Sequence, residues 1–137
     1  FSPLFFHYGE DVDYIHRMRF YGYRVGYTPL TSGCHDRQNR PITRQTQMKL
    51  DRVYYLSVVS DLNSGMAKCL WGGVLAPLKP GVLALLRGRF KEFCFYTGTS
   101  VRLLCRYPSI AEIKRFCKQG RPVFLENVHS KIKPIWS

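Results

Sequence analysis

The chain has 137 residues, of which 45% are hydrophobic and 15% aromatic, and its formal net charge is +12. This apolar content suffices for one modest domain with its own core, and it excludes an intrinsically disordered chain. The five cysteines are an odd number without a zinc-ligand spacing, which argues against a zinc site and indicates free, buried thiols in a reducing compartment.

The first predicted element is an acidic helix. Three carboxylates, at Glu10, Asp11 and Asp13, follow an aromatic run and Gly9. Apolar residues then recur at helical spacing, which predicts a helix that opens at Gly9–Glu10 and stops at Gly22. The unpaired N–H groups and the dipole of a first turn favour anions, so these carboxylates stay ionised and can act as bases. Simple helix-start acids would also explain an acidic pair taken alone.

Two further features follow this helix. Residues 23–27 alternate in the manner of a short half-buried strand, which ends at Pro29. The chain then reaches Cys34–His35–Asp36.

The string FFHYGEDVDYIHRMRFYGYRVGYTP…CHD, over about residues 1–40, resembles the acceptor-side half of family 2 glycosyltransferases. These are inverting nucleotide-sugar enzymes with a GT-A fold. Their signature there is aromatic–Gly–Glu–Asp–x–Asp, an Arg one turn on, an aromatic–glycine turn and a late His. The resemblance implies that residues 1–41 form the acceptor-side end of a GT-A catalytic domain.

The resemblance also implies roles for the acidic residues. Asp11 would be the general base that deprotonates the acceptor hydroxyl, and Glu10 would orient the acceptor or tune the base. The chemistry explains the requirement, because a sugar hydroxyl is a poor nucleophile without a carboxylate within hydrogen-bond reach of its proton. The residues expected to bind the acceptor are His7, Tyr8 and Asp13.

A divalent metal is the cofactor that the resemblance implies. In the family such a metal neutralises the leaving diphosphate, and the late His that helps to hold it falls on His35. Mg²⁺ or Mn²⁺ fits oxygen ligands better than zinc does. Cys34–His35–Asp36 would equally suit a structural hydrogen-bonding cluster. The string Asp11–Val12–Asp13 lies in the acceptor-side motif, so we do not interpret it as the metal motif.

The nucleotide-binding half that the family places before this point has no counterpart in the sequence, and no glycine-rich phosphate loop is present. We therefore expect the chain to be the C-terminal portion of a longer enzyme, inactive alone. The site for the nucleotide-sugar donor would lie mostly in the other half.

Residues 42–137 are expected to form a basic, mainly helical extension. Residues 1–41 carry five Lys/Arg against four Asp/Glu, whereas residues 42–137 carry sixteen against five. The pattern predicts a helix after Met48 that closes at 61–65, an apolar run from Met66 that Pro77 and Pro80 cut, a long element over 81–107, and a last helix over 110–118 capped by Ser109. The expected fold is α+β but mainly helical: a GT-A fragment of helix and short strand, followed by this amphipathic extension.

The extension has no 18 uninterrupted apolar residues, and its closest segment, 69–86, contains two prolines and Lys79. Basic, aromatic helices of this kind suit the interface of an anionic membrane. Together with the resemblance, this predicts a cytoplasmic protein, peripheral at the inner face of the cell membrane. The resemblance implies that it acts on a glycan or lipid-linked acceptor in envelope polysaccharide synthesis. A solvated basic face over an ordinary core is the alternative.

The alternative function is a non-catalytic basic module that binds a membrane surface, a partner protein or nucleic acid. A pI near 9.8 with aromatics among Lys/Arg fits nucleic acid, but it leaves the acidic motif unexplained and no RNP or zinc-finger motif is present. If the chain folds alone, sheet edges left exposed would favour a homo-oligomer.

Overall fold

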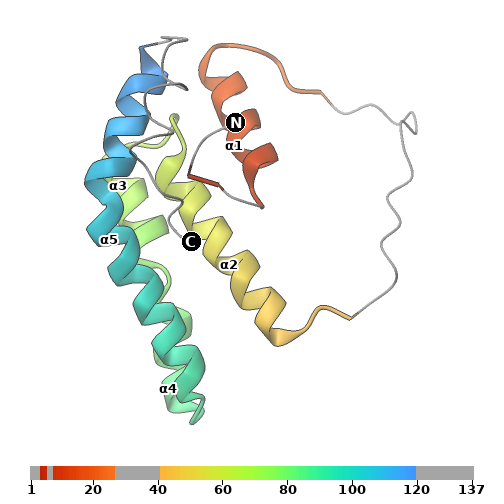
Figure 1. Ribbon diagram of the computed structural model, residues 1–137, viewed down its shortest axis with the longest axis vertical. Helices are drawn as coiled ribbons and strands as arrows, with labels where there is room; N and C mark the ends of the chain where they lie inside the picture. Colours follow the sequence, from red (N-terminus) through yellow and green to blue (C-terminus); the bar gives the residue numbers. More distant parts are fainter. Residues whose placement is uncertain (1–3, 6–7, 27–40, 120–137) are drawn as a thin grey trace.

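The computed structural model describes residues 4–5, 8–26 and 41–119, and every regular element in these ranges is helical (Figure 1). In chain order they are α1 (Glu10–Phe20), α2 (Arg44–Ser60), α3 (Met66–Lys68), the π-helical segment η1 (Cys69–Leu75), α4 (Leu78–Leu86) and α5 (Phe90–Lys118). The expectation of a mainly helical chain is confirmed. The predicted strand is wrong for residues 23–26, which are exposed and irregular, because the described residues offer no second strand for them to pair with.

Helix α1 has the predicted boundaries. Gly9 precedes it with φ 88, in the left-handed region that glycine adopts without strain. At its end Gly22 has φ 82, the Gly22 N–H donates to the Arg19 carbonyl at 3.1 Å, and the Tyr23 N–H donates to the Met18 carbonyl at 3.0 Å. This pair of bonds is a Schellman motif, which satisfies carbonyls that would otherwise lack a partner.

Helix α2 starts earlier than the apolar pattern indicates. The Thr43 side chain accepts a hydrogen bond from the Thr46 N–H at 3.2 Å, so the polar residues 44–47 form its first turn. Two of the polar contacts between α2 and α5 are a hydrogen bond from the Tyr96 hydroxyl to Asp51 at 2.6 Å and an ion pair of Arg44 with Glu92 at 2.7 Å. Burial and the Asp51 carboxylate both raise the pKa of Tyr96, which keeps this hydroxyl protonated.

The prolines do not cut the apolar run after Met66. The chain stays helical through α3, η1 and α4 because Pro77 and Pro80 lie at the start of α4, where missing N–H groups are tolerated. Gly72 and Gly73 lie within η1 and let it approach α2. By length and composition alone, the run Met66–Leu86 is long and apolar enough to cross a membrane, with a mean hydropathy of 1.6. This corrects the expectation of a broken segment.

Helix α5 is one continuous element of 29 residues that runs antiparallel to α4 (Figure 1). The predicted turn at Pro108 and the cap at Ser109 are therefore wrong. Pro108 cannot donate to the carbonyl of Leu104, but this part of the helix is exposed and water can take that bond. Burial of Leu103 and Ile110 on one face holds the two halves of the helix in line.

The core lies where α2, η1 and α5 meet. The side chains that are fully shielded from solvent there include Leu56, Val59, Leu103 and Ile110. Leu4 and Phe5 from the N-terminal segment join the same cluster. Their burial places the start of α1 directly beside α2.

The thiols agree only in part with the expectation that they are free and buried. Cys69 and Cys117 are free and buried, and burial raises the pKa of Cys117. Cys94 and Cys105 are free but exposed, because they lie on the outer face of α5. The fifth, Cys34, lies outside the described residues.

Candidate functional site

The first turn of α1 presents two carboxylates in different environments. Asp11 is exposed, and its Oδ1 accepts a hydrogen bond from the Val12 N–H at 2.8 Å. Glu10 is half-buried, and its Oε2 is shielded from solvent without a hydrogen-bond partner among the described residues. One carboxylate is thus open to a ligand, and beside it a shielded oxygen has an unused acceptor position.

Gly9 fixes the position of this pair. A Cβ atom built on Gly9 would lie 2.6 Å from Cγ1 of Val53 and 3.0 Å from the ring of Phe5. Only glycine therefore permits both the left-handed turn and the close approach to α2. The acidic pair is held against the core cluster rather than on a free loop.

The other residues predicted for the acceptor site lie in different places. Tyr8 is 54% exposed directly before Gly9, which fits an acceptor contact. Asp13 is only 5% exposed and forms an ion pair with Arg17 at 2.9 Å. Burial raises the pKa of Asp13, although Arg17 opposes that effect. This placement favours a structural role for Asp13 over an acceptor contact. His7 lies outside the described residues.

The structure does not supply a metal centre in the described part of the chain. Residues 4–5, 8–26 and 41–119 contain no group of three His, Cys, Asp or Glu side chains that could hold a metal ion. His35, the ligand that the resemblance implied, lies outside these ranges. No catalytic step can therefore be derived through a metal from these residues.

Asp61 organises the junction between α1, α2 and α3. It accepts hydrogen bonds from the Asn63 N–H and the Ser64 hydroxyl at 2.9 and 2.7 Å, and the Asn63 side chain donates to the His16 carbonyl on α1. The His16 ring is 3.8 Å from Asp61, so His16 is part of the scaffold beneath the acidic pair. Burial raises the pKa of Asp61, but the bonds from Asn63 and Ser64 outweigh it and hold the pKa below its ordinary value.

Asp61→Asn is expected to lower the free energy of unfolding at pH 7 by about 1.5–3 kcal/mol, because it weakens hydrogen bonds to a charged acceptor. Because the pKa of Asp61 is lower in the folded protein, this stabilisation is complete above pH 3.8, which is the pKa of Asp61 in the unfolded chain. The stabilisation is lost as the pH falls through the pKa of Asp61 in the folded protein. Urea unfolding of both proteins from pH 7 into acid should show the difference narrowing below about pH 4. A difference that stays constant with pH would contradict the charged role of Asp61.

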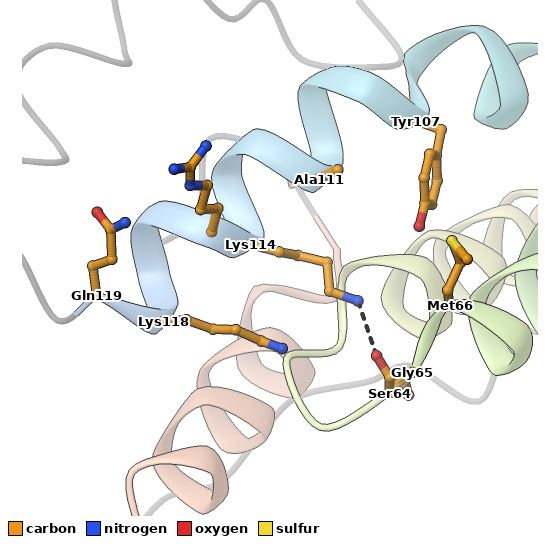
Figure 2. Close-up of a pocket in the computed structure, with 9 residues that line it drawn as sticks. Ser64, Gly65, Met66, Tyr107, Ala111, Lys114, Lys118 and Gln119 are labelled. Carbon is orange, nitrogen blue, oxygen red and sulfur yellow. Dashed lines mark hydrogen bonds between the residues drawn. The ribbon is translucent and has the colours of Figure 1, made fainter.

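The described residues also form a recess, which the sequence did not predict. A basic hollow of about 430 Å³ lies between α5 and the start of α3, and it is lined by Ser64, Gly65, Met66, Tyr107, Ala111, Lys114, Arg115, Lys118 and Gln119 (Figure 2). The Lys114 ammonium crosses this hollow and donates to the carbonyls of Val59 and Ser64 at 3.2 and 3.3 Å. Figure 2 shows the Lys114 side chain pointing to Ser64. Lys114 thus caps the carboxyl end of α2, a long-range contact that no local sequence signal indicated.

Lys114→Met is expected to lower the free energy of unfolding by about 1–3 kcal/mol, because buried carbonyls at the end of α2 lose their donor. Arg115→Met removes the same charge from an exposed position one residue on, and it should change stability by no more than about 0.5 kcal/mol. Thermal or urea unfolding of the parent and both variants measures the two changes in stability. Equal losses would show that net charge, not the capping bonds, decides the result.

No protein-family model, curated protein or solved structure matches this chain. Functional inference therefore depends on the residues themselves. Of the site residues predicted from the sequence, the structure brings Tyr8, Glu10 and Asp11 to one end of α1.

Proposed function

We propose that this chain forms the acceptor side of an inverting family 2 glycosyltransferase, which transfers a sugar from a nucleotide-sugar donor to a glycan or lipid-linked acceptor. The observation that carries the proposal is the geometry at Gly9–Glu10–Asp11. A glycine that tolerates no side chain places an exposed carboxylate and a shielded one on the first turn of a helix. This arrangement is compatible with the aromatic–Gly–Glu–Asp motif of the resemblance.

Asp11 is the base in this proposal. It takes the proton from an acceptor hydroxyl while that oxygen attacks the anomeric carbon, and the nucleoside diphosphate leaves from the opposite face with inversion. The exposure of Asp11 supports the role, since the acceptor must come within hydrogen-bond reach of the carboxylate.

Tyr8 orients the acceptor in this proposal, and Glu10 supports the base. The Glu10 Oε2 atom is shielded from solvent, so Glu10 stands beside Asp11 without contacting the acceptor through this oxygen. The exposed ring of Tyr8 offers an apolar surface for the face of a sugar. The aromatic residue and the carboxylate pair together form the acceptor end of the site.

The donor side of the proposal lies outside the described residues. A nucleotide-binding half would supply the donor site, and Mg²⁺ or Mn²⁺ would stabilise the charge of the leaving diphosphate. His35 remains the predicted protein ligand for that metal. The proposed location is the cytoplasmic face of the cell membrane, where lipid-linked acceptors present their headgroups.

A transfer assay tests the proposal. The full gene product is incubated with a panel of nucleotide sugars, Mn²⁺ or Mg²⁺ and a lipid-linked acceptor, and the anomeric configuration of the product is read by NMR. We expect turnover that stops on chelation of the metal and a product with inverted configuration. Retained configuration would overturn the proposal, and so would absence of transfer across the panel from a folded protein that binds nucleotide sugars.

A further inference from the structure

One face of the helical run Met66–Leu86 is apolar and exposed along its whole length. Five large side chains on this face, three or four positions apart, are exposed by between 37% and 78%: Trp71, Leu75, Leu78, Val82 and Leu86. We call these five the apolar stripe. The spacing places them along one side of the helical run.

The opposite side of the same run provides its packing. Gly73 and Val74 are buried in η1, and Gly81 and Ala84 are buried in α4. Gly81 approaches Tyr96 of α5, and Gly73 approaches Val59 of α2. Because these buried residues pack on the inner face of the run, the apolar stripe on the opposite face points away from the protein core.

The charges around the apolar stripe are mainly positive. Residues 66–91 contain five Lys/Arg, at positions 68, 79, 87, 89 and 91, and no Asp or Glu. Lys68 lies 3.9 Å from Asp61 and Arg89 lies 3.8 Å from Glu92, whereas Lys79, Arg87 and Lys91 form no ion pair with another described residue. The turn between α4 and α5 lies at one end of the molecule (Figure 1). Arg87 and Arg89 belong to this turn, directly after Leu86, and both are exposed. An apolar stripe between cations is complementary to a surface that is apolar inside and anionic outside.

We propose that the apolar stripe docks on an anionic lipid bilayer, with the run Met66–Leu86 lying in the plane of the interface. A run of this length spans about 30 Å, so the whole stripe can enter the acyl boundary at once. Trp71 suits the interfacial depth, and the long Lys and Arg side chains reach the headgroups from beside it. Binding should be stronger on anionic than on neutral lipid.

The charges distinguish this occupant from two others. A second copy of the chain would bring the same mainly positive surface against this one, which is repulsive. Nucleic acid offers phosphates to the cations but no apolar layer for the stripe. The proposal is independent of the glycosyl-transfer reaction, since it uses none of the residues at the start of α1.

Vesicle binding followed by tryptophan fluorescence tests this proposal. The chain contains two tryptophans, so Trp136→Phe leaves Trp71 as the reporter. We expect a blue shift and co-sedimentation with vesicles of phosphatidylcholine mixed with phosphatidylglycerol, and weak binding to phosphatidylcholine alone. Lys79→Gln with Arg87→Gln should weaken binding to the anionic vesicles by about fivefold for each cation removed.

The apolar contribution is tested with a matched pair of double variants. Val82→Glu with Leu86→Glu should lower partitioning by at least about tenfold, because each places a charge where lipid contact is expected. Ile42→Glu with Tyr54→Glu adds the same charge at two exposed apolar residues outside the apolar stripe. This control variant should lower partitioning only by the smaller amount that results from the added negative charge. Far-UV circular dichroism checks that both remain helical.

Three results would overturn the proposal. The first is equal loss of vesicle binding in the two double variants, and the second is no binding to anionic vesicles by the parent. The third is that self-association or duplex DNA binding depends on Val82 and Leu86, whereas lipid binding does not depend on them. That last result would assign the stripe to a second copy or to nucleic acid.

Discussion

Gly73→Ala is expected to lower the free energy of unfolding by about 3 kcal/mol, near the upper end of the cost of overpacking a core. A Cβ at this position would lie 2.2 Å from Cγ2 of Val59 and 3.3 Å from the carbonyl oxygen of Tyr55. Val59 is fully buried and cannot move aside. The added methyl group would therefore push η1 away from α2, and urea unfolding would register the loss.

Gly98→Ala is the matched control for this prediction. Gly98 lies inside α5, and a Cβ there meets no atom within 4 Å. Alanine should therefore stabilise the protein by about 0.5–1 kcal/mol through helix propensity. Equal stability of Gly73→Ala and the parent would contradict the close packing of η1 on α2.

Asp11→Asn is expected to lower kcat for glycosyl transfer by about 10²- to 10⁴-fold, the usual contribution of a general base. Asparagine keeps the size of the side chain and an oxygen that can accept from the Val12 N–H, so α1 should form normally. Donor affinity, measured by calorimetry, should stay unchanged because the donor site lies elsewhere. A variant that lost donor binding or folding together with transfer would place Asp11 in the scaffold instead.

The acidic helix was predictable because its signals are local. Gly9 and Gly22 mark its ends, as the sequence indicated, and in the structure both adopt the left-handed conformation. The position of Glu10 and Asp11 in the first turn follows directly. The burial of Asp13 was not predictable, since which side of a helix faces the core depends on its tertiary neighbours.

The helical extension shows where local signals fail. Pro77, Pro80 and Pro108 indicated breaks, yet the first two lie at the start of α4 and the third lies where the outer carbonyl is exposed to water. The close approach of η1 to α2 depends on Gly72 and Gly73, a contact with no signature in the local sequence. The capping role of Lys114 likewise depends on the approach of α5 to the end of α2.

The central claim, that the exposed carboxylate at the start of α1 is a catalytic base, is tested most directly by one comparison of transfer rates. The full gene product is assayed as the parent, as Asp11→Asn and as Glu112→Gln, which removes an exposed carboxylate from α5. The account predicts a loss of at least about a hundredfold for Asp11→Asn and parental turnover for Glu112→Gln. Transfer by Asp11→Asn at the parental rate would contradict it and leave a basic, membrane-binding helical module as the better description.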